Sequence, residues 1–268
     1  MRAPRNAAPT GPAHPAGRTS RRVAGAFLGV VCAVLGSVVA ATAGCSSLPE
    51  APPGIDRTQL VNDLAARLNH GGDRAYAADY QLRGGAVATI AQAQNPLRLA
   101  FTYPGGVFQV TSDGTVECTA TAAGTTGPAD NMGNTPGGTM RCVRTAPPSG
   151  APRADSYGPV STHGMIAPAV AVSLLSAAAL DPSATVTQRD TTVGGQHATC
   201  VKVGGVHGAL TSAFEACVTD DGVLGSFTGQ LGETAIDVVL IRYSDTPPEN
   251  AFDLPAGARI DDQRPKKS

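Results

Sequence analysis

The spacing of apolar residues changes along the chain from one typical of helices to one typical of strands. Apolar positions three and four residues apart predict a first helix, which Gly71 and Gly72 would end. It would bury Leu60, Val61, Leu64 and Leu68. Apolar and polar residues then alternate in short segments separated by turn dipeptides such as Asp113-Gly114, which predicts an antiparallel meander. The predicted strands are residues 76–83, 86–93, 97–103, 107–112 and 115–121.

A second helix and a second set of strands follow two irregular stretches. Residues 122–138 predict a Gly/Thr/Asn/Pro loop, and residues 147–159 another irregular segment. Residues 165–180 predict a helix with Pro168 in its first turn, ended by Asp181-Pro182. Its apolar residues leave little polar face, so we expect burial on most sides. They are Ile166, Val170, Val172, Leu174, Leu175 and Leu180.

The second half is again predicted to be strands. The segments are 185–193, 197–203, 213–218, 223–229 and 235–243, followed by a short segment at 251–260. Asp221-Gly222 gives the strongest hairpin signal among them. With 42% hydrophobic residues but only 4% aromatic ones and no Trp, the core must consist mainly of Ala, Val, Leu and Ile. We therefore expect an α+β fold in a single globular domain, residues 58–260, with a basic tail at 261–268.

The first 44 residues have the features of an export signal. Five arginines and no acidic residue precede an apolar run at 23–43, which ends in small residues. Thr42-Ala43-Gly44-Cys45 resembles a bacterial lipobox, in which the cysteine is acylated and becomes the mature N-terminus. We expect Cys45 to carry acyl chains such as palmitate, and residues 45–57 to be a proline-rich tether. An uncleaved membrane helix is the alternative, and both place the domain on the extracytoplasmic side of the cell membrane.

Charge and cysteine content limit the classes of partner and site that the sequence allows. Without the leader, the chain has 15 Lys and Arg against 21 Asp and Glu, which argues against nucleic-acid binding. Cys118, Cys142, Cys200 and Cys217 form an even set in an oxidising compartment, so disulfides are favoured over a zinc site. Three pairings are possible, and we favour Cys118–Cys142 and Cys200–Cys217 because each would close a short excursion between predicted strands.

Motifs for catalysis are absent from the sequence. There is no nucleophile elbow, no zinc-protease motif and no phosphate-binding loop. The histidines are interpreted as structural polar residues, and Asp220-Asp221 as part of a turn. We expect no enzyme activity, no metal and no cofactor.

Three segments support a resemblance to a known family. Residues 194–201 (GGQHATCV) and 217–224 (CVTDDGVL), with the ending at 245–255 (DTPPENAFDLP), look like uncharacterised actinobacterial lipoproteins. More distantly, the chain resembles the LolA-like family that includes the mycobacterial LppX and LprG lipoproteins. The resemblance implies a curved antiparallel half-barrel with helices on its concave face and an apolar cavity between them. The cysteine pairs and the 122–138 loop are departures from that family.

The resemblance implies a carrier or binder of a hydrophobic ligand, such as a lipid or acyl chain. The helix at 165–180 would cross the concave face, and its Val170, Leu174 and Ala177 would line a pocket opposite Phe108 and Ile236. The same residues could instead fill a core, and the sequence ranks the two equally. A non-enzymatic envelope interaction or sensor module without a small ligand is the alternative, and a secreted hydrolase is a third.

Overall fold

The computed structural model describes residues 56–121, 140–150 and 153–265. Cys45, the predicted signal and most of the predicted tether lie outside the described residues, as does the predicted loop at 122–138. No helix within the described ranges is both long enough and apolar enough to span a bilayer.

The first helix forms where the apolar spacing predicts it. Helix α1 spans Arg57–Gly71 and begins at Asp56, whose carboxylate accepts a hydrogen bond from the Thr58 amide at 3.3 Å. This side-chain cap satisfies one of the free amides of the first turn. Val61, Leu64 and Leu68 are buried on the inner face of the helix, which confirms the helix, whereas Leu60 is only partly buried.

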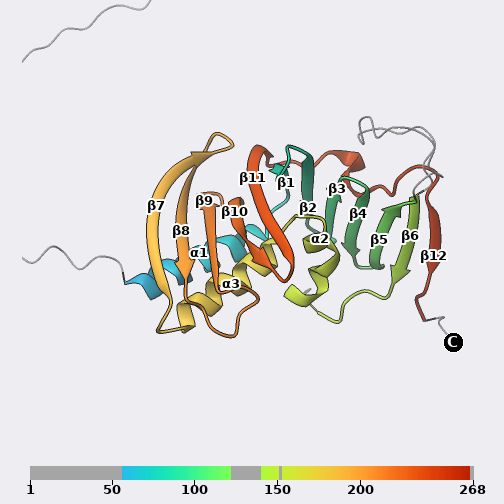
Figure 1. Ribbon diagram of the computed structural model, residues 1–268. Coiled ribbons are helices and arrows are strands. Elements are labelled where there is room, and N and C mark those ends of the chain that lie inside the picture. The colour runs from blue at the N-terminus through green and yellow to red at the C-terminus, as the bar shows by residue number, and fades with distance from the viewer. Residues whose placement is uncertain (1–55, 122–139, 151–152, 266–268) are drawn as a thin grey trace, which may run out of the picture. The chain divides into compact units, whose positions relative to one another are not determined.

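The described strands form one twelve-stranded, open sheet that curves in Figure 1. Its order is β12-β6-β5-β4-β3-β2-β1-β11-β10-β9-β8-β7. The first meander comprises β1 (Tyr76–Leu82), β2 (Val87–Ala93), β3 (Arg98–Tyr103), β4 (Gly106–Thr111), β5 (Gly114–Ala120) and β6 (Met140–Thr145). The second comprises β7 (Thr185–Val193), β8 (Gln196–Gly204), β9 (Ala213–Thr219), β10 (Leu224–Leu231) and β11 (Thr234–Ser244).

The two meanders join at the middle of the sheet, where β1 pairs antiparallel with β11. The ten predicted strands are confirmed to within one or two residues at each end, whereas β6 was not among the predicted strands. The final strand, β12 (Arg259–Asp262), pairs with β6 and is parallel to it, which the sequence pattern did not predict. A 3-10 turn, η2 (Glu249–Phe252), precedes it within the predicted final segment.

The apolar helix differs from its prediction at its start and in the burial of its last residue. Helix α3 spans Pro168–Leu180, so it starts at Pro168, not at residue 165. Pro168 lacks the amide that a longer helix would need, so Met165, Ile166 and Ala167 are buried without being helical. Leu180 is 84% exposed, which corrects the expectation that it is buried. The irregular segment at 147–159 also contains a 3-10 turn, η1 (Ala154–Tyr157), and leads into a short helix, α2 (Gly158–Thr162).

The main core lies on one face of the sheet, which we call the helix face. Alternate strand residues such as Tyr80, Phe101 and Phe227 point to this face and belong to one buried cluster with α1 and α3. The two helices lie side by side over the β7–β11 half (Figure 1). The pattern of one buried face per strand is that of an antiparallel sheet with a single main core.

The opposite face carries two small clusters, each built around a disulfide. Cys118–Cys142 and Cys200–Cys217 are both bonded, as predicted, and each pair occupies directly opposed positions of neighbouring strands. The first is buried with Val107 and Val116, and the second with Ala198. Because side chains alternate along a strand, these cysteines face away from the helices.

The C-terminal segment crosses the first meander on the face that carries the disulfides, opposite the helix face. The Arg98 guanidinium lies 4.4 Å from the centre of the Phe252 ring, and the Gln109 amide donates to the Asp253 carbonyl at 3.3 Å. Leu254 and Ala258 then cover the Cys118–Cys142 cluster before β12 reaches β6. This segment therefore supplies a second layer that the first meander needs on that side.

The β9–β10 hairpin is docked against the end of α1. Arg67 pairs with Asp220 at 3.3 Å, and Arg74 donates to both the side chain and the carbonyl of Asp221. Asp220-Asp221 thus belongs to a hairpin turn, as interpreted from the sequence. The contact is so close that a Cβ added at Gly71 would lie 1.9 Å from the Gly222 carbonyl oxygen.

Candidate functional site

The five residues predicted to line a ligand pocket do not meet in one cavity of the described structure. Val170, Leu174, Phe108 and Ile236 are each at most 2% exposed and belong to the main core. Ala177 is half-buried and, with Leu174, lines an open groove of about 480 Å³ beside residues 208–210. Their role as ligand contacts stays a prediction, and the space beneath the middle of α3 is filled by side chains.

An apolar crevice instead opens where the last turn of α1 meets the first turn of α3. We call it the α1–α3 crevice, and its volume is about 150 Å³. The helices contribute Leu68, Asn69, Gly72, Pro168, Ala169 and Val172, and the strands and their connections contribute Gln92, Leu97, Leu99, Val110 and Tyr157.

The crevice follows from where the two helices end. The helices are antiparallel, because the Arg57 side chain at the start of α1 donates to carbonyls just after the end of α3. Gly72 ends α1 and Pro168 starts α3, so no further helical turn covers β2–β4 at this point. The small Ala169 side chain leaves the remaining space open.

Tyr157 forms an aromatic wall of the crevice. Its ring makes edge contacts with Phe101 and Phe108, with ring centres 5.6 and 6.1 Å apart. Burial raises the pKa of the Tyr157 hydroxyl to about 12, so the ring is neutral at physiological pH. The wall therefore presents an uncharged aromatic surface to anything that enters.

Gln92 is the buried polar residue of the crevice, and its amide is already engaged. It donates to the Gly72 carbonyl at 2.5 Å and to the Arg74 carbonyl at 2.8 Å. The first bond satisfies the carbonyl of the residue that caps α1, and the second ties down the turn that leads from α1 to β1. Gln92 thus fixes the helix end that bounds the crevice.

The crevice continues into a more open groove. Leu97 and Val110 line both the crevice and an adjoining space of about 290 Å³, which also involves Pro147 and Pro148. Beyond it, Asp262 and Arg264 line the next hollow. Leu97 is 45% exposed at the junction, so the surface changes from apolar to charged along this path.

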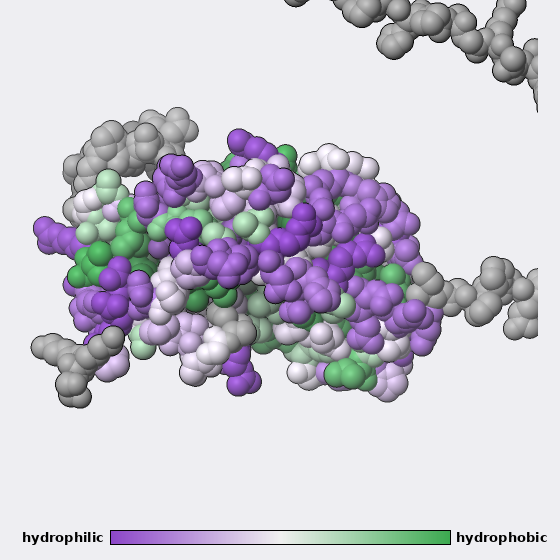
Figure 2. All heavy atoms as spheres, turned by 180° about the vertical axis from the view of Figure 1, so that it is seen from behind, coloured by the Kyte–Doolittle hydropathy of each residue, from purple (hydrophilic) through white to green (hydrophobic). Residues whose placement is uncertain are grey.

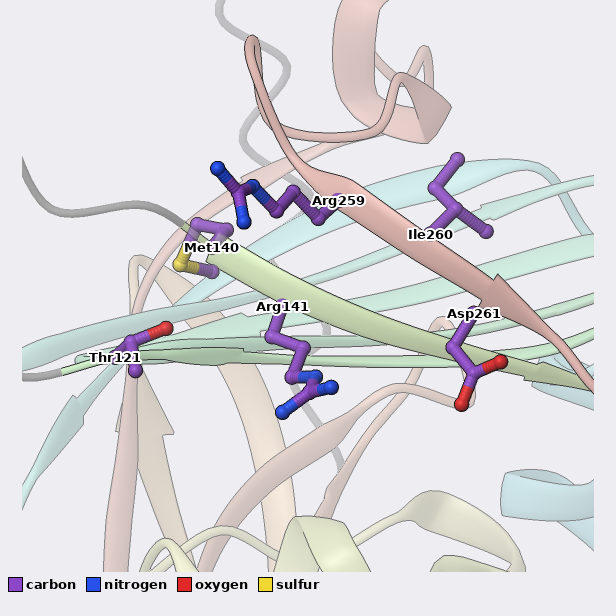
Figure 3. A pocket seen from close by; sticks show the side chains of 6 residues that line it. All are labelled: Thr121, Met140, Arg141, Arg259, Ile260 and Asp261. Carbon is purple, nitrogen blue, oxygen red and sulfur yellow. The ribbon is translucent and has the colours of Figure 1, made fainter.

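A second, polar pocket lies at the β6–β12 edge of the sheet. Figure 3 shows the guanidinium groups of Arg141 and Arg259 on opposite sides of β6, with that of Arg259 on the side of Met140. The two guanidinium groups therefore do not converge, as they would in a bidentate anion site. Figure 2 shows the molecule from behind, with mostly polar surface and an apolar area near this end.

One cluster has the residue types of a hydrolase triad but not its geometry. Both Ser183 Oγ and Asp181 Oδ2 approach the same nitrogen of His207, Nδ1, at 3.0 and 3.1 Å. In a catalytic triad, the serine and the carboxylate contact opposite ring nitrogens. Hydrogen bonds from Ser183 and from the His207 amide hold the pKa of the Asp181 carboxyl well below its usual range. The cluster closes the turn after α3.

The other three histidines of the described residues are also accounted for by local contacts. His197 pairs with Asp220 at 3.1 Å, His70 lies 3.7 Å from Asp73, and the His163 ring stacks on Tyr103. Within the part of the chain that the structure describes, no three His, Cys, Asp or Glu side chains are grouped as metal ligands would be.

Comparisons with known proteins give similarity in structure alone. No family model matches the chain, and no curated protein matches its sequence. An uncharacterized conserved protein from Thermus thermophilus is similar at a TM-score of 0.42 and 10% identity, over 76% of this chain and all of that one. MucB is similar at a TM-score of 0.43 and 10% identity, and MucB in the Pseudomonas aeruginosa MucA/MucB complex at 0.42 and 12%. These two matches span 75% of this chain and 62–64% of the MucB chains.

Sequence reasoning found the helix but not the part of it that borders an opening. Ala169 and Val172 lie within the predicted helix, whereas Tyr157 lies in the segment predicted to be irregular and Leu97 at a strand end. The early Pro168 was the usable signal, because a proline at the first helical position marks where cover by the helix begins.

Proposed function

We propose that this protein is a non-enzymatic, membrane-anchored extracytoplasmic protein that binds an apolar chain in the α1–α3 crevice. The observation that carries the proposal is the crevice itself. It is an opening between helices and sheet, lined mainly by apolar side chains and one uncharged aromatic wall. Apolar concave sites with few polar groups are the usual binding sites for hydrophobic ligands.

The expected location supports this proposal. The lipobox-like Cys45 would hold the mature chain at the outer face of the cell membrane, where lipids and acyl chains are available. The acidic balance of the mature chain makes nucleic acid an unsuitable partner. The geometry at His207, where serine and aspartate share one ring nitrogen, supports binding without hydrolysis.

The volume limits what can bind. Sites for whole small molecules usually measure about 300–1,000 Å³. The crevice, at about 150 Å³, suits the end of one acyl chain, with the rest of the chain lying along the groove past Leu97. The charged pair Asp262 and Arg264 further along would then face the polar end of the ligand.

The packed core favours one second candidate, an envelope interaction module. Val170 and Leu174 leave no opening beneath the centre of α3, and the same crevice would accept a single apolar side chain of a partner protein. Such a side chain in a desolvated pocket is typical of a binding hot spot.

The deciding experiment fills the crevice with a tryptophan. Ala169→Trp places an indole in the crevice, and Ala177→Trp is the matched control on the same helix, since Ala177 is also half-buried but lines a different groove. Binding of a dansyl-labelled fatty acid to the purified, delipidated protein is measured for both, together with thermal unfolding.

We expect Ala169→Trp to abolish probe binding without lowering the melting temperature, because the indole occupies existing space. Ala177→Trp should bind as the natural protein does. Equal binding by all three would contradict the acyl-chain proposal. No binding by any of them, with no lipid found by native mass spectrometry of the membrane-extracted protein, would favour the interaction module.

A further inference from the structure

The two most exposed large apolar side chains of the described residues are both leucines. Leu180 is 84% exposed at the end of α3, and Leu210 is 61% exposed in the connection between β8 and β9. Neither belongs to a buried cluster of the described residues. Apolar groups presented together at a surface often mark a contact with another surface.

The two leucines belong to the same end of the domain. The His207 amide donates to Asp181 Oδ2 at 2.7 Å, which holds the β8–β9 connection against the end of α3. Leu210 and Ala177, one helical turn before Leu180, line the same groove. Leu180 and Leu210 therefore lie at the same end of the domain, where the end of α3 meets the β8–β9 connection.

The described domain also begins at this end. The Arg57 guanidinium donates to the Pro182 carbonyl at 2.7 Å and to the Ala184 carbonyl, so the start of α1 lies beside the turn that follows Leu180. Figure 1 shows the start of α1 and the end of α3 together beneath β7 and β8. Cys45 lies twelve residues before Arg57, and an extended chain of that length reaches at most about 40 Å.

The chemistry of this end fits a bilayer surface better than a second protein. Two leucines supply far less than the roughly 800 Å² per partner that a stable protein interface buries. A covalent anchor raises the local concentration of the membrane, so that even a small apolar contact is occupied. The neighbouring carboxylate of Asp181 accepts hydrogen bonds from the His207 amide and from the Ser183 amide and hydroxyl, so protein donors already satisfy it at this surface.

We infer that Leu180 and Leu210 form a membrane-contact surface that inserts into the outer leaflet of the anchoring membrane and orients the domain on it. The inference rests on the proposed function for the lipid anchor at Cys45 and not for the ligand. With Leu180 and Leu210 at the membrane, the end of α3 lies at the bilayer surface and its start, at the α1–α3 crevice, lies farther from the bilayer.

The test uses tryptophan as a unique reporter, since the natural chain has none. Leu180→Trp and Leu210→Trp are made in the full-length, lipidated protein and reconstituted into phosphatidylcholine vesicles with and without brominated acyl chains. Ile260→Trp is the matched control, because Ile260 is 46% exposed on β12, at the opposite edge of the sheet from β7.

We expect the emission of the tryptophans at 180 and 210 to shift to shorter wavelength in vesicles and to be quenched by brominated lipid. The tryptophan at 260 should show neither effect. Equal quenching at all three positions, or none at 180 and 210, overturns the inference. A protein that does not stay with the vesicles overturns both the anchor and this surface. Binding of the dansyl-labelled fatty acid by the same variants reports separately on the crevice.

Discussion

The two ends of the sheet use the same covalent link but are stabilised from opposite faces. Near one edge, Cys118–Cys142 joins β5 to β6, and near the other, Cys200–Cys217 joins β8 to β9. Each link connects directly paired positions whose Cα atoms are 3.9 Å apart. In the β8–β9 end, the strands also contribute Val201, Ala216 and other residues to the main core under α1 and α3.

The β5–β6 end has no comparable share of the main core. Its residues that alternate with the cysteines, such as Glu117, Thr119 and Arg141, are polar and partly or fully exposed. Its buried residues face the other way, into the small cluster that the C-terminal segment covers. At the β8–β9 end, the disulfide therefore supplements a large core. At the β5–β6 end, the disulfide stands where a large core is lacking. The crevice lies where the cover by the helices stops.

The largest effect should come from disturbing the contact between α1 and the β9–β10 hairpin, at the end of the sheet that contains the β8–β9 disulfide. Gly71→Ala would place a Cβ against the Gly222 carbonyl, which is backbone and cannot move aside without moving the hairpin. We expect a loss of about 3 kcal/mol or more in the free energy of unfolding, measured by urea denaturation.

Gly232→Ala is the control, because Gly232 has a positive φ of 58° but no neighbouring atom within 4 Å. It should cost only the left-handed backbone penalty of about 1–2 kcal/mol. Equal losses for both variants would show that the close contact of α1 with the hairpin is unimportant.

The next prediction compares the loss of each disulfide. Cys118→Ala with Cys142→Ala, and Cys200→Ala with Cys217→Ala, should each cost about 3 kcal/mol, because the closed loops, with sequence separations of 24 and 17, are similar in length. We expect the first pair of changes to expose mainly β5, β6 and β12 to hydrogen exchange, since no helix covers them. The second should lower protection throughout the main core. The same exchange pattern in both variants would contradict the contrast between the ends.

The smallest effect concerns alkaline pH. Burial raises the pKa of Tyr103 and of Tyr157 to about 12, and also raises the pKa values of Tyr76 and Tyr80. Strands β7–β10 contain no tyrosine. Unfolded tyrosines lose their protons near pH 10, so the unfolded state then binds fewer protons than the folded state.

The stability that these tyrosines contribute is therefore present below pH 10 and is lost as the pH rises toward 12. Urea unfolding at a series of pH values measures the loss, and Tyr157→Phe should reduce its slope. A slope that Tyr157→Phe leaves unchanged would mean that Tyr157 is not the group responsible.

The local pattern of the sequence was sufficient for most of the secondary structure. Period-two alternation and turn dipeptides such as Asp113-Gly114 and Asp221-Gly222 located the ten predicted strands before the final segment. These signals are local, because a strand must alternate its side chains and a tight hairpin must use residues that accept its backbone. The cysteine pairing also followed from local order, since each pair belongs to neighbouring strands.

Contacts between distant segments decided the rest. The pairing of β1 with β11, and the parallel pairing of β12 with β6, join segments that share no local signal. Leu174 and Ala169 are both in an apolar helix, and their spacing cannot tell which is covered by the sheet and which borders an opening. That depends on where α1 ends against α3. The sequence determined ten of the twelve described strands, the turns between them and the disulfides, because each depends on neighbouring residues. Only the tertiary structure decided where the core closes and where it leaves a crevice, because burial depends on what the rest of the chain places above each side chain.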